Sequence, residues 1–220
     1  MKISMEYNQD GKLVCFSETD NEPTLLSKKN TRKLKGKSLL SVPNSYVVLD
    51  LETSGLNTMA NDIIEIGMIK VVEREIVDTF ESLVNPGYRI SPFITQLTGI
   101  TNEMLITAPT IFDVMPKAQA FIGDSIVVAH NANFDINFMY DTCKKHKFPL
   151  FCNDFVDTMR LSRRLYPCEK HHRLKDLTER FGVTNESEHR ALSDVLATNS
   201  CLLYMQDYID AQEICVHSLK

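Results

Sequence analysis

The sequence contains no long apolar run. No stretch approaches the ~18 consecutive apolar residues that a membrane-spanning helix needs. The first residues, Met1 to Glu6, lack the apolar core of a secretory signal peptide. Neither an internal repeat nor a low-complexity block is visible. We therefore expect a cytoplasmic protein that has no membrane attachment.

The cysteines form no C-x-x-C pair. The chain has six of them, and they are scattered along its length: Cys15, Cys143, Cys152, Cys168, Cys201 and Cys215. This spacing argues against a zinc site and against a disulfide framework, and it fits a reducing compartment. We interpret them as core or incidental thiols.

A strong positive charge is also missing, because the formal net charge is −5. The field of the whole molecule therefore does not indicate a nucleic-acid binder. The charge is uneven, however, and the stretch from Lys28 to Lys37 (KKNTRKLKGK) has basic residues and no acid. Such a segment could contact phosphates or form a solvated linker, and we favour the linker.

The length of 220 residues suits one α/β domain with a sizeable core and an extension. Residues 1–45 contain few large apolar side chains, which predicts a poorly ordered or small N-terminal extension that carries the basic segment. A weak hairpin signal lies around Asp10–Gly11. Residues 46–210 form the expected folded domain, and residues 211–220 form a C-terminal tail.

Apolar periodicity predicts the elements of that domain. Strands are expected at 46–51, 63–72, 75–84, 125–129 and 153–156. Helices are expected at 92–97, 101–105, 110–121, 131–145, 157–165, 173–181 and 190–208. Ser91 is a plausible N-cap for the first of these helices, and Gly99 should end it. Antiparallel strands followed by strands that alternate with helices predict an α/β fold, with a mixed five-stranded sheet flanked by helices.

Two acids stand at the end of the first of these strands. Asp50 and Glu52 are two residues apart, so their side chains point to the same face. Neighbouring carboxylates raise each other's pKa unless a cation intervenes, and Mg²⁺ prefers oxygen ligands. The alternative is a strand-end turn with two solvated acids.

Three further side chains complete the pattern. Asp135 falls in the opening turn of the helix that follows strand 125–129, and Asp194 lies near the start of the last helix. Both acids would also interact favourably with a helix dipole, which is the simpler reading of each one alone. Positions five apart on a straight helix are turned by ~140°, so His189 can share a site with Asp194 only from the lead-in or first turn. From there it could approach and leave a substrate.

Four converging acids would repel one another strongly without cations. Two divalent ions ~3.5–4 Å apart would neutralise them and hold a phosphodiester, one activating water and the other stabilising the leaving oxygen. An imidazole with an ordinary pKa near 6.5 suits His189 to removing a proton from that water.

Three stretches occur in a familiar order: Asp50-x-Glu52-Thr-Ser-Gly, Asn131-Ala-Asn-Phe-Asp135 and His189-x4-Asp194. They resemble the three motifs of the DnaQ-like, DEDDh-type 3′-to-5′ exonucleases, which have a ribonuclease H-like fold. The resemblance extends from about Tyr46 to Tyr208, so residues 46–210 would form the exonuclease domain. It is strongest to the exonuclease region of Gram-positive replicative DNA polymerases of the PolC type and to free-standing bacterial relatives.

The resemblance implies a role for each site residue and two Mg²⁺ or Mn²⁺ ions. Asp50 would bridge both metals. Glu52 and Asp194 would complete the site of the water-activating metal, and Asp135 would hold the other. His189 would be the general base.

The resemblance also implies contacts with the substrate. Thr53 should meet the terminal nucleotide, and Leu97 and Phe134 would flank its base or sugar. Core packing explains Leu97 and Phe134 about as well. Many relatives carry histidine where this chain has Thr98, so the contact of that histidine is not expected here.

The implied reaction is stepwise hydrolysis of DNA from the 3′ end to nucleoside monophosphates, in proofreading or repair. The expected partners are single-stranded or 3′-end DNA and a DNA polymerase subunit. One alternative is an RNA 3′-to-5′ exonuclease of the oligoribonuclease or ribonuclease T kind, because the contacts to a 2′-hydroxyl cannot be read from sequence. Another is a non-catalytic nucleic-acid-binding subunit associated with a polymerase.

Overall fold

The computed structural model describes residues 4–7, 13–17, 24–25 and 32–218, and the surroundings of side chains for residues 32–211. Contacts divide the chain into two units, Met1–Lys33 and Leu34–Lys220. In the first unit, β1 (Ser4–Tyr7), β2 (Leu13–Ser17) and β3 (Thr24–Leu25) pair in an antiparallel sheet. The hairpin turn expected at Asp10–Gly11 lies outside the described residues, as do residues 1–3, 18–23 and 26–31 of the expected extension.

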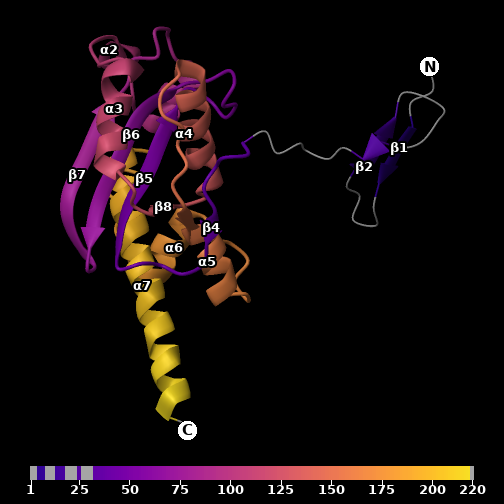
Figure 1. The fold of residues 1–220 in the computed structure, drawn as a ribbon, viewed down its shortest axis with the longest axis vertical. Helices are drawn as coiled ribbons and strands as arrows, with labels where there is room; N and C mark the ends of the chain where they lie inside the picture. The colour runs from indigo at the N-terminus through magenta and orange to yellow at the C-terminus, as the bar shows by residue number, and fades with distance from the viewer. Residues whose placement is uncertain (1–3, 8–12, 18–23, 26–31, 219–220) are drawn as a thin grey trace. The chain divides into compact units, whose positions relative to one another are not determined.

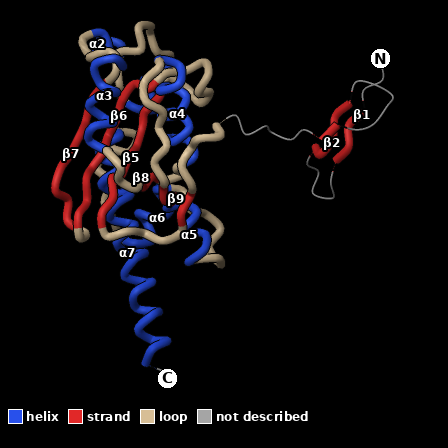
Figure 2. Tube along the Cα trace, viewed as in Figure 1, coloured by secondary structure: helices blue, strands red, loops and turns tan. Residues whose placement is uncertain are grey.

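The second unit is built on a mixed sheet, in the part of the chain that the structure describes (Figure 1, Figure 2). Three long strands pair antiparallel: β5 (Ser45–Thr53), β6 (Ile63–Val72) and β7 (Glu75–Leu83). Three short strands continue the sheet on the other side of β5 and run parallel to it: β8 (Val127–Ala129), β9 (Phe155–Asp157) and β4 (Ser38–Leu39). The predicted α/β class is confirmed.

The sheet has six strands in the described residues, whereas five were predicted. The additional strand is β4, which the sequence analysis placed in the N-terminal extension. Two residues are too few to show a period, but β4 pairs parallel with β9, and Phe155 donates a backbone hydrogen bond to Lys37 O (N···O 2.9 Å). A Cβ on Gly36 would lie 1.8 Å from the carbonyl oxygen of Asn153. Residues 34–45 therefore belong to the larger unit.

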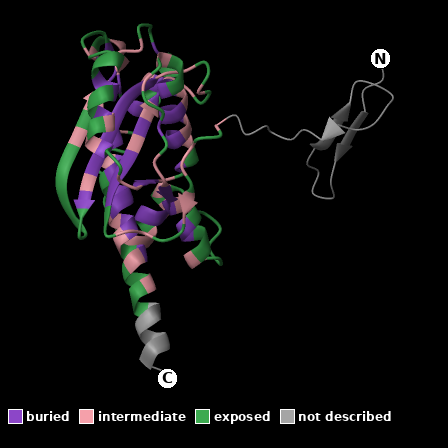
Figure 3. Ribbon diagram, in the orientation of Figure 1, coloured by how far each residue is buried: buried purple, intermediate pink, exposed green. Residues whose placement is uncertain are grey.

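Helices cover both faces of the sheet, as the buried residues show (Figure 3). The side chains of Val47, Leu49 and Leu51 pack against α3 (Ile111–Ile122) and α4 (Asn133–His146). Those of Tyr46 and Val48 pack on the opposite face with α5 (Thr158–Leu165), α6 (Leu174–Phe181) and α7 (Ala191–Ser218). Because side chains alternate along a strand, Asp50 and Glu52 point toward the α7 face.

A smaller core lies beside the sheet. There α1 (Pro92–Thr98) and α2 (Asn102–Ile106) contribute buried residues that pack with Ile64. Helix α1 begins after Ser91 and ends at Gly99, whose φ of 72° glycine adopts readily. These are the boundaries that the sequence indicated. Among the helices in the described part of the chain, none combines the length and apolar character needed to cross a bilayer.

Candidate active site

The candidate site begins where β5 and β8 separate. Strand β8 pairs with β5 at Val47 and Val48 and ends at Ala129. Among the described residues, no strand lies beside the following part of that edge of β5. The first turn of α4 fills the opening, because Leu51 N–H donates a hydrogen bond to Asp135 Oδ1 (N···O 3.2 Å). Asp135 is almost completely buried. The end of β8 therefore brings Asp135 to the strand that carries Asp50.

Helix α7 reaches the same place from the other face. Gly67 lies opposite Asp50 in the β5–β6 ladder, and a Cβ on it would lie 2.5 Å from the carbonyl carbon of Ala191. The missing side chain allows the start of α7 to rest directly on β6. Asp194, in the first turn of α7, is thereby placed over the acidic end of β5.

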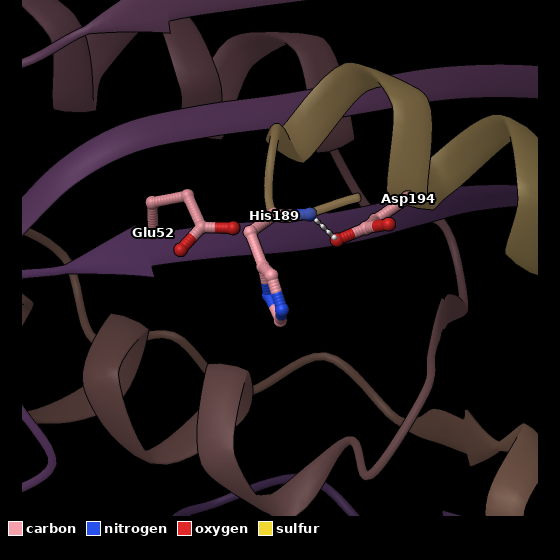
Figure 4. Close-up of side chains that lie close together, drawn as sticks. All are labelled: Glu52, His189 and Asp194. Atoms are coloured by element: carbon pink, nitrogen blue, oxygen red, sulfur yellow. Dashed lines mark hydrogen bonds between the residues drawn. The ribbon is translucent and has the colours of Figure 1, made fainter. Parts of the chain in front are cut away.

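Three of the expected residues form a compact group. Glu52, His189 and Asp194 each offer a ligand atom, and these atoms lie within 4.8 Å of one another. Figure 4 shows the carboxylate of Glu52 turned toward His189, whose backbone N–H donates to Asp194 Oδ2 (N···O 3.1 Å). His189 has φ 64°, a left-handed conformation that is uncommon outside glycine. The group thus joins β5, the segment before α7, and α7 itself.

Asp50 and Asp135 are not members of that group of three, but their charges interact with it. Burial raises the pKa of Asp50 well above its usual value, and Asp194 and Glu65 raise it further. Burial likewise raises the pKa of Asp135, and the charge of Asp50 adds to the rise. The four acids therefore share one electrostatic environment.

The remaining two carboxyl groups are shifted in the same direction. Burial, followed by the charge of Asp50, raises the pKa of Glu52 to about 9. Burial also raises the pKa of Asp194, although hydrogen bonds from Asn185 and His189 oppose the rise. The protein alone therefore favours protonated acids here. A divalent cation would favour the ionised forms, and oxygen-rich donor sets suit Mg²⁺ and Mn²⁺.

Two of the residues expected to contact the substrate, Thr53 and Phe134, are each next to a site acid in the sequence, and the third, Leu97, lies on α1. Thr53 is buried, and its hydroxyl donates to Gly55 O (O···O 2.8 Å). Leu97 is 41% exposed on α1, whereas Phe134 is half-buried against Phe138 with ring centroids 4.9 Å apart. Thr98 is buried, and it donates to a backbone carbonyl of α1, so it presents nothing to a substrate.

Sequence reasoning missed several residues that support the site. Glu65 lies opposite Glu52 in the β5–β6 ladder, and Arg190 binds it through both carboxylate oxygens. Asn185 Nδ2 donates to Asp194 Oδ1 (N···O 2.6 Å). The available signal was Glu65 itself, because a charged residue in the buried part of a strand usually has a partner.

A small hollow opens beside His189 and Asp194. Its volume is about 230 Å³, and its lining includes Arg173, Lys175 and Glu188. Lys175 Nζ lies 3.8 Å from Glu188 Oε1, and both side chains are about half exposed. A larger hollow of about 710 Å³ lies elsewhere, along residues 119–126 and 149–154, and none of the site acids lines it. Of the candidate site residues, His189 and Asp194 therefore line the smaller hollow.

The chain matches known proteins over the region that carries this site. The model of the exonuclease family RNase_T matches residues 47–202. DNA polymerase III PolC-type of Caldanaerobacter subterraneus subsp. tengcongensis is 42% identical over 184 residues, which cover 84% of this chain and 13% of that protein. DNA polymerase III PolC-type of Streptococcus pyogenes serotype M2 is 41% identical over 164 residues, which cover 74% of this chain and 11% of that protein. The chain thus spans only a small part of the length of these relatives.

Solved structures agree with that match. Exonuclease X in complex with 5′ overhanging duplex DNA is 30% identical with a TM-score of 0.61, covering 74% of this chain and 92% of that one. The nuclease domain of 3′hExo, a DEDDh family member bound to rAMP, is 20% identical with a TM-score of 0.67. The match covers 76% of this chain and 94% of that one. The second likeness concerns the fold alone. The chain therefore belongs to the exonuclease family, as a DnaQ-like member of the DEDDh type with the ribonuclease H-like fold.

Proposed function

We propose that this domain hydrolyses DNA from the 3′ end and releases nucleoside monophosphates, in proofreading or repair. The observation that carries the proposal is the convergence of Glu52, His189 and Asp194 over two further buried acids. DNA is favoured over RNA because the relatives that are at least 30% identical have names that mention DNA. The neighbour bound to rAMP is more distant, at 20% identity.

The acids would hold two divalent cations, Mg²⁺ or Mn²⁺. Asp50 would bridge the pair, Glu52 and Asp194 would complete one position, and Asp135 the other. The donor set fits, because every one of these groups offers carboxylate oxygens and all four have raised pKa values that a cation would oppose. When bound, such ions activate water and stabilise the leaving oxygen of a phosphodiester.

His189 would act as the general base. It is exposed, and it stands between Glu52 and Asp194, where it can take a proton from the attacking water. The water oxygen then bonds to phosphorus as the bond to the 3′ oxygen of the preceding nucleotide breaks. That oxygen leaves with a proton as the new 3′-hydroxyl.

The substrate would be held without regard to its sequence. Thr53, Leu97 and Phe134 would contact the terminal nucleotide. The positively charged side chains of Arg173 and Lys175 line the hollow beside His189, and they would meet the phosphates of the preceding nucleotides. Contacts of this kind position a strand and carry no sequence information.

The similarity to PolC-type polymerases favours work beside a DNA polymerase in the cytoplasm. The chain covers only 13% and 11% of the two relatives, so a polymerase would have to be a separate subunit or another part of a longer protein. A pull-down with the replicative polymerase would distinguish a stable partner from independent repair activity.

An end-labelled degradation assay tests the proposal. Matched DNA and RNA single strands are incubated with the protein and Mg²⁺ or Mn²⁺, with and without chelator, and beside the Asp135→Asn variant. We expect stepwise shortening of DNA from the 3′ end that chelator and the variant abolish. Faster trimming of RNA would favour the ribonuclease alternative. No degradation of either strand would favour a binding subunit.

A further inference from the structure

Glu65 is a buried acid that the proposed reaction does not use. It lies on β6, opposite Glu52 in the ladder, and its side chain is 0% exposed. It is two residues from Gly67, so it points to the same face, toward α7. A buried carboxylate without a partner would lower the stability of the fold, so Glu65 needs groups that bind it.

Arg190 and the start of α7 supply the partners. The guanidinium donates from Nε to both carboxylate oxygens of Glu65 (3.1 and 3.2 Å) and from Nη2 to Oε1 (2.7 Å). The backbone N–H of Ala191 donates to Oε2 (2.9 Å). A planar guanidinium matches a carboxylate in this geometry, which the ammonium of lysine cannot reproduce. One side chain on β6 thus binds two consecutive residues at the start of α7.

The residue before Arg190 is His189. Its left-handed backbone conformation persists only when the surroundings fix it. Asp194 binds the N–H of His189 on one side, and Glu65 binds Arg190 and Ala191 on the other. The segment that carries the candidate base is therefore held at both ends.

We propose that Arg190 is a positioning residue, whose bidentate pair with Glu65 fixes the start of α7 and so holds His189 and Asp194 over Asp50 and Glu52. Arg190 would not touch the substrate, and it acts through its two neighbours. This inference rests on the proposed function for the meaning of the site, but the contact geometry stands independently. The pair also occupies both oxygens of Glu65, which keeps this fifth acid from competing for cations.

The charges agree with that arrangement. The charge of Glu65 raises the pKa of Glu52, whereas Arg190 lowers it. Removing the guanidinium alone would leave a fifth uncompensated acid beside the other four. The Arg190 side chain therefore serves both the placement and the charge balance of the site.

The test compares Arg190→Met with Arg74→Met. Arg74 also connects the β6–β7 hairpin to α7, through Asp207 and Asp210, but those contacts lie about 20 Å farther along the helix than Asp194. We expect Arg190→Met to lower kcat about 10–100-fold with KM nearly unchanged, and to weaken Mn²⁺ binding measured by calorimetry. Arg74→Met should alter neither quantity.

Arg190→Lys keeps the charge and loses the planar fork, so it tests the proposal if Arg190→Met does not fold. It should fold, and kcat should still be lowered. Hydrogen exchange of the His189 and Ala191 amides gives a readout that needs neither metal nor substrate, and we expect faster exchange in both Arg190 variants. If wild type shows no nuclease activity, the proposed function is wrong. Amide exchange would still test whether the Arg190–Glu65 pair fixes the start of α7.

Equal kcat, Mn²⁺ affinity and amide exchange in Arg190→Lys and wild type would overturn the proposal. So would equal losses in Arg190→Met and Arg74→Met, because a general loss of stability would then explain both.

Discussion

The two halves of the site are held by different means. Asp50 and Glu52 lie on β5 where it pairs with β6, and Asp135 is bound to the backbone of the same strand. His189 and Asp194 lie at the start of α7, where side-chain hydrogen bonds fix them. Backbone pairing therefore fixes the position of the sheet half (Asp50, Glu52 and Asp135). The position of the α7 half (His189 and Asp194) depends on a few side chains. Loss of a carboxylate from the first half should remove cation binding, whereas changes to the side chains that support the second should misplace His189 and Asp194 without removing them.

The largest effect should come from the sheet half. Asp50→Asn removes the carboxylate that would bridge both cations, so kcat should fall on the order of 10³-fold, the equivalent of about 4 kcal/mol. The same variant should melt at a higher temperature than wild type in chelator, because burial and neighbouring acids disfavour the ionised form of Asp50. Degradation assays and thermal melts measure the two effects.

Asp78→Asn, at an exposed acid on β7, is the matched control and should leave both quantities unchanged. Full activity in Asp50→Asn would contradict a bridging role.

The α7 half should respond differently. His189→Gln removes the candidate base and leaves all four acids, so kcat should fall about 10²–10⁴-fold while Mn²⁺ affinity is retained. Degradation assays measure kcat, and calorimetry measures the affinity for Mn²⁺. A variant that loses Mn²⁺ binding along with rate would show that His189 is needed for the cation site itself.

The sequence predicts well the features that a period or a local turn can encode. The short apolar run from Val47 to Leu49 places Asp50 and Glu52 at the end of a buried strand. Ser91 and Gly99 mark the two ends of α1, and both boundaries are found in the structure. In each case the deciding interactions join residues that are close along the chain.

The features that the sequence did not predict depend on contacts between residues that are far apart along the chain. Arg190 and Glu65 are 125 positions apart, and their pair is visible only after β6 and α7 have packed. Strand β4 forms because Lys37 and Ser38 meet β9, more than a hundred residues away. Neither contact leaves a periodic pattern. Consequently the acids of the site could be predicted, whereas the residues that hold the α7 half could not.

The pH dependence of stability should report on the sheet half. The pKa of Glu52 rises from an ordinary 4.5 to about 9 in the protein without cations. Between these pH values the folded protein holds a proton that the unfolded chain releases, so stability in chelator should fall as pH rises through that window. Cations need the ionised form, so stabilisation by Mg²⁺ should grow over the same range.

Thermal melts between pH 5 and 9, with chelator and with Mg²⁺, measure both trends. Glu52→Gln cannot titrate, so its slope in chelator should be flatter than that of wild type. A melting temperature in chelator that rises with pH would contradict the assignment.

The smallest effect should come from the hollow beside the α7 half. Lys175 lines it and is only loosely paired with Glu188, so it is available to a phosphate of the substrate strand. Lys175→Met should weaken binding of single-stranded DNA of any sequence, and the slope of log affinity against log salt should be shallower by about 0.7. The rate at saturating DNA should change little, because no reacting atom is involved.

Lys117→Met, at an exposed cation on α3, removes the same charge away from the hollow and should keep the wild-type slope. If the two variants gave the same slope, the strand would leave the site by a different path, and the hollow beside the α7 half would have no part in holding the substrate.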